Sequence, residues 1–320
     1  MKMVQGRDSP YALLLRNQVP LIALVAVCVF TAVLSDRFLS PVNLNNILLQ
    51  ACVMSVIAMG MTFVIVSGGF DLSVGSTVAL SGTVATWVML ETHWAVGVAA
   101  GIAAGALVGY VNGLIVARLR VNPFIATLGT MVVVRGIVLL ITDGRPIVGD
   151  EGLPDTFIEL GRGRLFGVHL LVWLPLLLFA VFGWLLHMTA YGKRVFATGG
   201  NRDAAFLAGI DVDRITASAY TWCGTLAGVA GVMLAARLQS GQPTAGEFYE
   251  LTAIAAVVLG GASLRGGEGQ LYKSIIGVFI MVVLANGLNL LNVHSYWQRV
   301  AVGLVIIAAA AADQFNARRT

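Results

Sequence analysis

A short polar segment interrupts two long apolar stretches in the first quarter of the chain. It reads SGGFDLSVG over residues 67–75 and separates Leu44–Ser67 from Leu72–Leu90. A glycine pair readily ends a helix, and the Asp71 carboxylate can cap the helix that follows by accepting a hydrogen bond from a free backbone amide. Two interpretations are open: a broken helix whose end faces a polar solute, or a tight turn between two complete helices. The length of the flanking stretches favours the turn.

Three more polar side chains lie inside apolar stretches. Arg135 belongs to Pro123–Thr142 and is close enough to its end for the long side chain to snorkel toward water. Packing or snorkelling is therefore favoured over contact with a solute. Asn286 and Asn289 are three residues apart, which places them on one helical face. They either hydrogen-bond to a neighbouring helix or border a polar path, and both interpretations stay open.

The usual catalytic arrangements are missing from the sequence. The four histidines lie apart, with no second metal ligand at helical spacing: His93, His169, His187 and His294. Gly192-Lys193 is followed by Arg194 and lacks the upstream glycine of a phosphate-binding loop, so the chain is not expected to hydrolyse ATP by itself. The three cysteines are scattered through apolar runs and are expected to be packing residues. We therefore expect a protein that is not an enzyme.

The composition excludes most classes of soluble protein. Of the 320 residues, 58% are hydrophobic and only 11% are charged, whereas a soluble domain carries roughly a quarter charged residues. A cytosolic enzyme, a secreted disulfide scaffold and a nucleic-acid binder are all excluded, the last because the small positive excess is scattered. About ten apolar stretches between Val19 and Ala312 can serve as membrane spans. Leu251–Ser263 and Val300–Ala312 are the shortest. The fold prediction is an all-α polytopic bundle that forms a single transmembrane domain over residues 1–320.

The distribution of basic residues predicts the orientation. Most Lys and Arg residues fall on one side when the helices alternate from a cytoplasmic N-terminus, which places both termini in the cytoplasm. Two connections are long. Asp143–Val168 is then external and rich in acidic residues, and we expect it to help dock an external partner. Thr189–Arg214 is cytoplasmic.

The cytoplasmic connection contains a short predicted helix, Asn201–Ala208. Asn201 suits the N-cap position, Asp203 suits the first turn, and Gly209 suits the position after the last turn. The helix carries the apolar side chains of Phe206 and Leu207 outside the bilayer. Exposed apolar residues of this kind usually mark a partner surface. The alternative is a helix that lies on the membrane surface.

Several long strings carry a resemblance that covers nearly the whole chain. They are GMTFVIVSGGFDLSVGS from Gly60, NPFIATLGT from Asn122, GGNRDAAFLAGIDVDRI from Gly199, QPTAGEFYELTAIAAVVLGGASLRGGEG from Gln242 and NGLNLLNVHSYWQ from Asn286. At these residues the chain resembles the permease subunits of ATP-binding cassette importers for monosaccharides, the ribose, xylose, arabinose and galactose branch, and is most similar to the ribose-type members. Phe70 and Ala208 depart from the usual Ile and Ser of that family.

The resemblance implies a multi-pass protein of the bacterial inner membrane, with about ten helices, that works as a pair of permeases. It also implies a separate cytoplasmic ATPase, which binds ATP and Mg, and a periplasmic sugar-binding protein, with no cofactor in this chain. The segment matching Gly199–Val212 looks like the coupling helix that sits in a groove of the ATPase. The residues expected to take part in coupling are Gly199, Gly200, Asn201, Asp203, Ala204, Ala205, Phe206, Leu207 and Gly209.

The predicted function is import of a monosaccharide by alternating access, and Asp71, Ser73, Asn286 and Asn289 are predicted to border the translocation path. The main alternative is an ion-coupled secondary sugar transporter that works without a partner. Such carriers normally place acidic residues deep in their spans, and few are found here. An intramembrane enzyme is a second alternative, weakened by the absence of paired catalytic groups.

Overall fold

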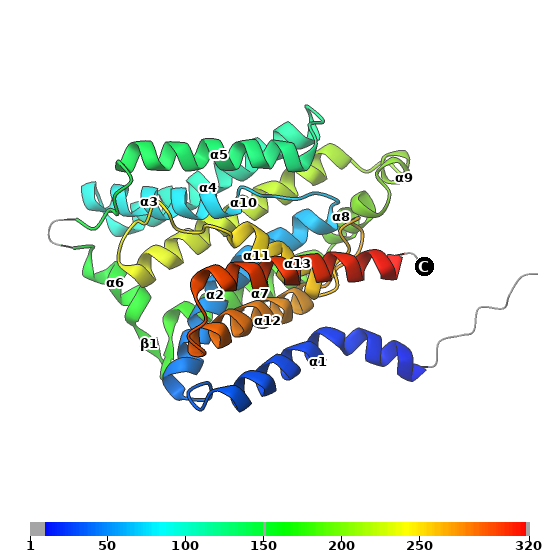
Figure 1. Cartoon of the computed structure of the whole chain (residues 1–320). Coiled ribbons are helices and arrows are strands. Elements are labelled where there is room, and N and C mark those ends of the chain that lie inside the picture. Colours follow the sequence, from blue (N-terminus) through cyan, green and yellow to red (C-terminus); the bar gives the residue numbers. More distant parts are fainter. Residues whose placement is uncertain (1–9, 150–151, 318–320) are drawn as a thin grey trace, which may run out of the picture.

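The computed structural model describes residues 10–149 and 152–317, and almost all of its regular structure is helical (Figure 1). The helices are α1 (Pro10–Leu34), α2 (Pro41–Val66), α3 (Val74–Glu91), α4 (Trp94–Ala117), α5 (Pro123–Thr142), α6 (Asp155–Arg162), α7 (Leu170–Met188), α8 (Ala190–Gly200), α9 (Arg202–Leu207), α10 (Val212–Leu238), α11 (Tyr249–Leu259), α12 (Leu271–Leu290) and α13 (Ser295–Ala317). An antiparallel pair of two-residue strands, β1 (Arg164–Leu165) and β2 (Val168–His169), precedes α7. The expected all-α class is confirmed.

Six of the described helices are long and apolar enough to cross a membrane: α2, α4, α5, α7, α10 and α12. Shorter apolar helical stretches cover Gln18–Leu34, Tyr249–Leu259 and Ser295–Ala311. The start of α1 and the end of α13 lie at the end of the bundle that also carries α9, whereas α6 and the β-hairpin lie at the opposite end (Figure 1). We call these two ends the α9 end and the hairpin end. The expected count of about ten crossings stays a prediction.

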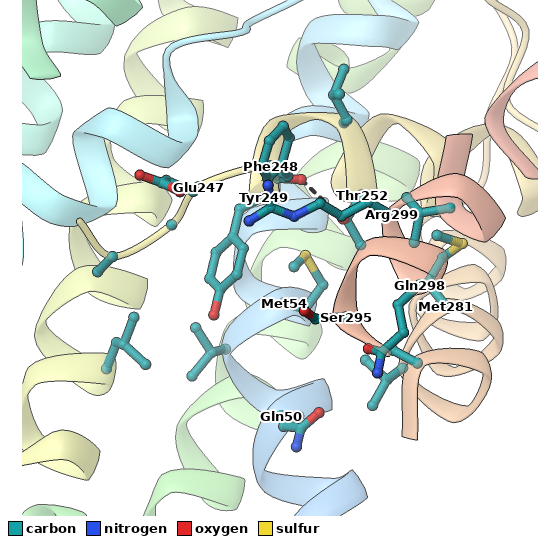
Figure 2. Close-up of a pocket in the computed structure, with 18 of the residues that line it drawn as sticks. Gln50, Met54, Glu247, Phe248, Tyr249, Thr252, Met281, Ser295, Gln298 and Arg299 are labelled. Carbon is teal, nitrogen blue, oxygen red and sulfur yellow. Dashed lines mark hydrogen bonds between the residues drawn. The ribbon is translucent and has the colours of Figure 1, made fainter. Parts of the chain in front are cut away.

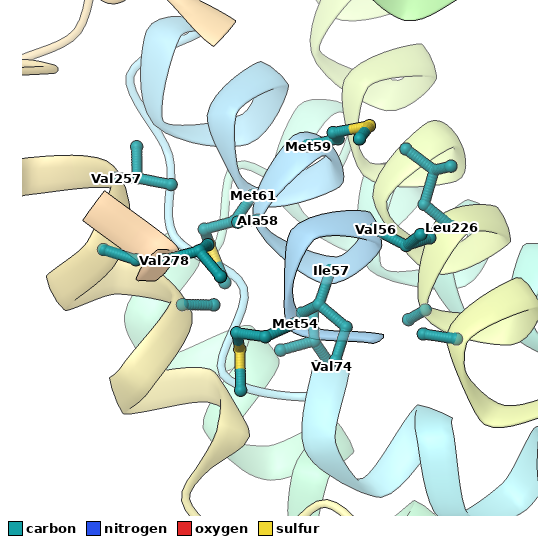
Figure 3. Packing of buried hydrophobic residues seen from close by; sticks show 14 of the residues in the cluster. Met54, Val56, Ile57, Ala58, Met59, Met61, Val74, Leu226, Val257 and Val278 are labelled. Atoms are coloured by element: carbon teal, nitrogen blue, oxygen red, sulfur yellow. The ribbon is translucent and has the colours of Figure 1, made fainter. Parts of the chain in front are cut away.

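Helix α2 occupies the centre of the bundle. Its last 16 residues are almost all apolar, and 94% of its most hydrophobic window is buried, which is the pattern of a helix surrounded by other helices. Its methionine, valine and isoleucine side chains pack against Leu226 of α10, Val257 of α11 and Val278 of α12 (Figure 3). The core of the protein is therefore built around this one helix.

Helix α4 packs closely on α3 and α10 through a row of glycines at every fourth position: Gly97, Gly101, Gly105 and Gly109. A β-carbon at Gly105 would lie 2.5 Å from the carbonyl oxygen of Gly224 in α10. Small residues let helix backbones approach in this way, and such contacts are a main source of association between helices in lipid.

Two non-helical segments, 67–73 and 239–248, run inside the bundle, and α3 and α11 begin in its interior where these segments end (Figure 1). Gly241 lies against Thr83 and Thr86 of α3, and Gly246 lies against Gly75. Thr86 and Gly75 are about 16 Å apart along α3 at a rise of 1.5 Å per residue. The segment 239–248 therefore follows α3 for much of its length.

Candidate functional site

The short helix expected in the cytoplasmic connection is present as α9, and both of its caps are formed as predicted. The Oδ1 atom of Asn201 accepts a hydrogen bond from the backbone N–H of Ala204 at 2.9 Å. Gly209 adopts a left-handed backbone with φ of +79° and donates to the carbonyl of Phe206, as glycine does after the last turn of a helix. The helical residues are Arg202–Leu207, because Asn201 and Ala208 are the caps.

Two large apolar side chains of α9 are exposed. Phe206 and Leu207 are 67% and 85% exposed, whereas Ala205 of the same helix is buried. An ion pair between Arg202 and Asp213, at 2.6 Å, ties the start of α9 to α10. Helix α9 therefore presents two exposed apolar side chains, and the ion pair holds its first residue, the base of the helix, against α10.

The chain just before α9 touches the core of the bundle, backbone to backbone. A β-carbon at Gly199 would overlap the carbonyl of Val66 at the end of α2, and it would lie 2.7 Å from the amide nitrogen of Gly267. That amide in turn donates to the carbonyl of Val66 at 2.9 Å. The two glycine-rich segments around Gly68 and Gly266 meet at the same place. The end of α8 is thus linked to α2 without intervening side chains.

Asp71 is buried, with 1% of its surface exposed, and does not cap α3 as the sequence suggested. Its Oδ1 atom accepts from the backbone N–H of Ser73 at 2.9 Å and from the Ser73 hydroxyl at 2.6 Å. The N-cap is Ser73 itself. The correction has a local cause: Asp71 bonds to the amide two residues ahead, which closes an Asx turn before the helix begins. Asn112 of α4 donates to the Ser73 hydroxyl at 2.8 Å and joins α4 to this turn.

The segment 67–73 has turns at both ends, at residues 67–68 and 72–73, and its backbone groups find partners on other helices. The Tyr220 hydroxyl of α10 donates to the carbonyl of Phe70 at 3.0 Å. The amide of Leu72 donates to the Thr127 hydroxyl of α5 at 3.1 Å. These bonds explain how an irregular backbone is tolerated inside a membrane-embedded bundle.

Asn286 forms a reciprocal amide pair with Asn43 of α2. The Nδ2 atom of each donates to the Oδ1 atom of the other, at 3.0 and 2.8 Å. Asn289 instead accepts from Gln298 of α13 at 2.9 Å. Asp71, Ser73 and Asn286 are all buried. The structure therefore does not bring the four predicted path residues together around one space, and their assignment to the path stays a prediction.

Arg135 holds the non-helical segment before α11. Its Nη1 atom donates to the carbonyl oxygens of Pro243 at 2.6 Å and Ala245 at 2.9 Å. These two bonds explain the arginine inside α5 without snorkelling or contact with a solute. Its guanidinium donates to two backbone carbonyls that lie outside the helices.

A cavity of about 970 Å³ lies beside the same segment, between α2, α12 and α13. Phe248 and Tyr249 at the start of α11 border it, together with Gln50 of α2 and Gln298 and Arg299 of α13 (Figure 2). The Arg299 guanidinium lies 4.9 Å from the centre of the Phe248 ring. None of these five residues was singled out from the sequence. The short apolar stretch Leu251–Ser263, too short to cross alone, was the available signal.

The described part of the connection expected to be external contains α6 and β1. Phe157 of α6 is fully buried against Val232 and Ala236 of α10, and the Arg162 guanidinium donates to Oε1 of Gln239 at 2.8 Å. Burial, and to a smaller extent the neighbouring Arg164, lower the pKa of His169. Among the described residues, no group of three His, Cys, Asp or Glu is arranged to hold a metal ion.

Comparison with protein families gives a match over residues 43–310 to the family described as "Branched-chain amino acid transport system / permease component". The chain belongs to this permease family. Family membership and the six long apolar helices make it a multi-pass protein of the bacterial inner membrane. No solved structure matches the permease significantly.

Individual relatives of the permease are similar over almost their whole length. A ribose import permease protein of Escherichia coli K12 is 45% identical over 312 residues, which is 97% of each chain. One from Bacillus subtilis is 44% identical over 296 residues, 92% of each chain. An L-arabinose ABC transporter permease protein of Azospirillum brasilense is 39% identical over 318 residues, 98% of this chain and 93% of that one.

Proposed function

We propose that this permease is the membrane-spanning subunit of an ATP-binding cassette importer that carries a monosaccharide into the cytoplasm by alternating access. The observation that carries the proposal is the 45% identity to a ribose import permease over 97% of both chains. A transport subunit of this kind requires a separate ATPase, which binds ATP and Mg, and a solute-binding protein outside the membrane. The permease itself contributes the path and no catalytic group.

The proposed topology has ten crossings, with both termini and α9 in the cytoplasm, in one domain over residues 1–320. It is supported by the position of the start of α1, the end of α13 and α9 at one end of the bundle (Figure 1). Two copies of the permease work as a pair. The external hairpin and α6 then face the binding protein.

The proposed coupling element is α9 together with the glycines before and after it. The apolar pair Phe206 and Leu207 fits a groove on the ATPase, because these side chains are exposed on a helix whose base is fixed. Movement of α9 is passed to α2 through the contact of Gly199 with Val66. Asp71 and Ser73 act on the path by holding the start of α3 against α4. Asn286 holds α12 against α2, and Asn289 holds α12 against α13.

Transport into proteoliposomes tests the proposal. The permease is reconstituted with its ATPase, and uptake of radiolabelled D-ribose and L-arabinose is measured with the binding protein outside and ATP inside. We expect uptake that needs all three proteins and ATP. Uptake by the permease alone, driven by an ion gradient, contradicts the proposal and supports the secondary transporter.

A further inference from the structure

Helix α11 crosses only part of the bilayer. Its 11 residues extend about 16 Å, roughly half the thickness of the hydrocarbon core. The segment 239–248 supplies the remainder of the crossing as irregular backbone. Backbone of this kind is tolerated at membrane depth only where it is buried in protein or lines a water-filled space.

One side of the segment is satisfied by protein. Ile147 and Gly241 exchange both backbone hydrogen bonds, at 2.9 and 2.8 Å. Arg135 binds the carbonyls of Pro243 and Ala245. The other side of the segment borders the cavity of about 970 Å³, a volume within the usual range of small-molecule sites.

The residues around the cavity suit a neutral solute with many hydroxyl groups. Gln50, Gln298 and Thr252 offer uncharged donors and acceptors (Figure 2). The charged residues that border it, Arg237, Arg299 and Glu247, are of both signs, so the cavity has no single-sign field of the kind that selects ions. A sugar needs such hydroxyl partners together with an apolar surface for its C–H faces.

Phe248 provides that apolar surface, and its backbone is strained to do so. It has a left-handed conformation with φ of +64°, which is uncommon for any residue other than glycine and is concentrated at functional sites. Its carbonyl is held by the Thr252 hydroxyl at 2.9 Å. The ring is 45% exposed, with the Arg299 guanidinium over it. An aromatic face beside hydrogen-bonding groups is the pattern of a ligand site.

We propose that this cavity binds the monosaccharide during translocation, with the C–H face of the sugar against Phe248 and its hydroxyl groups bonded to Gln50 and Arg299. The proposal rests on the proposed function, since it assigns the sugar site of the same importer. It also gives the irregular segment a role, because the segment places Phe248 at the border of the cavity.

The reconstituted importer with its ATPase and binding protein separates the two proposals. Phe248→Ala and Gln50→Leu are compared with the wild-type permease for uptake of radiolabelled D-ribose and L-arabinose, and for ATP hydrolysis stimulated by the binding protein. Phe30→Ala is the matched control, since Phe30 is an exposed aromatic residue of α1 that does not border the cavity. We expect both cavity variants to lose at least tenfold in uptake while stimulated ATP hydrolysis stays within twofold, and the control to be unchanged.

Two results overturn the inference. In the first, both cavity variants transport at the wild-type rate. In the second, uptake and stimulated ATP hydrolysis fall in parallel in both variants, which indicates a structural role. If the wild-type importer itself transports no sugar, the proposed function fails instead.

Discussion

The Nη1 atom of Arg135 in α5 lies 2.9 Å from the carbonyl oxygen of Ala245, a residue 110 positions further along the chain. The same atom binds the carbonyl of Pro243. Arg135 therefore fixes the position of the irregular segment 239–248 along α5. It also fixes the position of α11, which follows that segment. The charged guanidinium inside the bundle thus acts as a hydrogen-bond donor to the backbone.

Replacing Arg135 by methionine removes both hydrogen bonds and leaves two carbonyls without donors. Hydrogen bonds to charged groups contribute about 1.5–3 kcal/mol each, so we expect a lower Tm of the detergent-purified permease and loss of sugar uptake. Arg145→Met is the control, because Arg145 and its partner Asp143 are largely exposed. Equal Tm values for the two variants would contradict the role given to Arg135.

Replacing Phe206 by aspartate places a charge on the exposed face of α9. We expect the ATPase to be lost from the purified complex. Phe206→Ala should weaken the association with the ATPase by the free energy of burying one aromatic side chain, about 1.5–3 kcal/mol. Asn201→Ala should have a milder effect through loss of a cap, about 1 kcal/mol. Co-purification is the measurement, with Phe166→Asp at the opposite end as control. Normal assembly and sugar uptake by the Phe206→Asp permease would mean that α9 lies on the membrane.

A methyl group at Gly199 collides with the end of α2. Gly199→Ala should therefore lower the Tm, with overpacking costing about 1–3 kcal/mol, and should uncouple ATP hydrolysis from uptake. Gly129→Ala is the matched control, since a β-carbon at Gly129 meets nothing within 4 Å. The prediction fails if Gly199→Ala retains the wild-type ratio of sugar imported to ATP hydrolysed.

The Asn43–Asn286 pair gives a double-mutant cycle. Each single change to leucine leaves a buried amide without its partner, which costs about 1–3 kcal/mol. The double variant removes both polar groups, so we expect it to be more stable than the sum of the single effects implies. Thermal unfolding measures the coupling. Strict additivity would show that the two side chains act independently.

Replacing Asp150, Glu151 and Asp155 by serine should weaken stimulation of ATP hydrolysis by the binding protein, most strongly at low salt, because charges at the rim steer association. Asp155 is exposed in the first turn of α6, while Asp150 and Glu151 lie outside the described residues. Stimulation that is unchanged at every ionic strength would make the external segment a connector only.

Local signals predicted α9 well, and long-range contacts explain what the sequence did not reveal. The caps of α9 depend on Asn201 and Gly209 and on backbone groups within a few residues, so residue type alone predicts them. Asp71 was assigned to the wrong cap because its carboxylate closes a turn with the amide of Ser73, and the bonding of that turn to Asn112 of α4 left no signal in the local sequence.

The cavity was beyond prediction for a similar reason. The path of 239–248 is set by Arg135 and by the contact of Gly246 with Gly75, and none of these contacts leaves a pattern in the segment itself. The burial of Asn286 against Asn43 likewise joins residues 243 positions apart. Sequence spacing placed Asn286 and Asn289 on one face but did not give their separate partners.

The central position of α2 has a consequence for biogenesis. Helix α2 is synthesised long before α10 and α12, the helices that enclose it, because proteins emerge from the N-terminus. Its apolar surface, with a mean hydropathy of 2.2 over the most hydrophobic window, makes it stable in lipid before α10 and α12 are inserted. Until α12 is inserted, Asn43 lacks its partner Asn286. The side-chain hydrogen bonds of α2 are therefore completed only when α12 has joined the bundle. Chains that stop before α12 should therefore insert α2 but leave it open to membrane quality control.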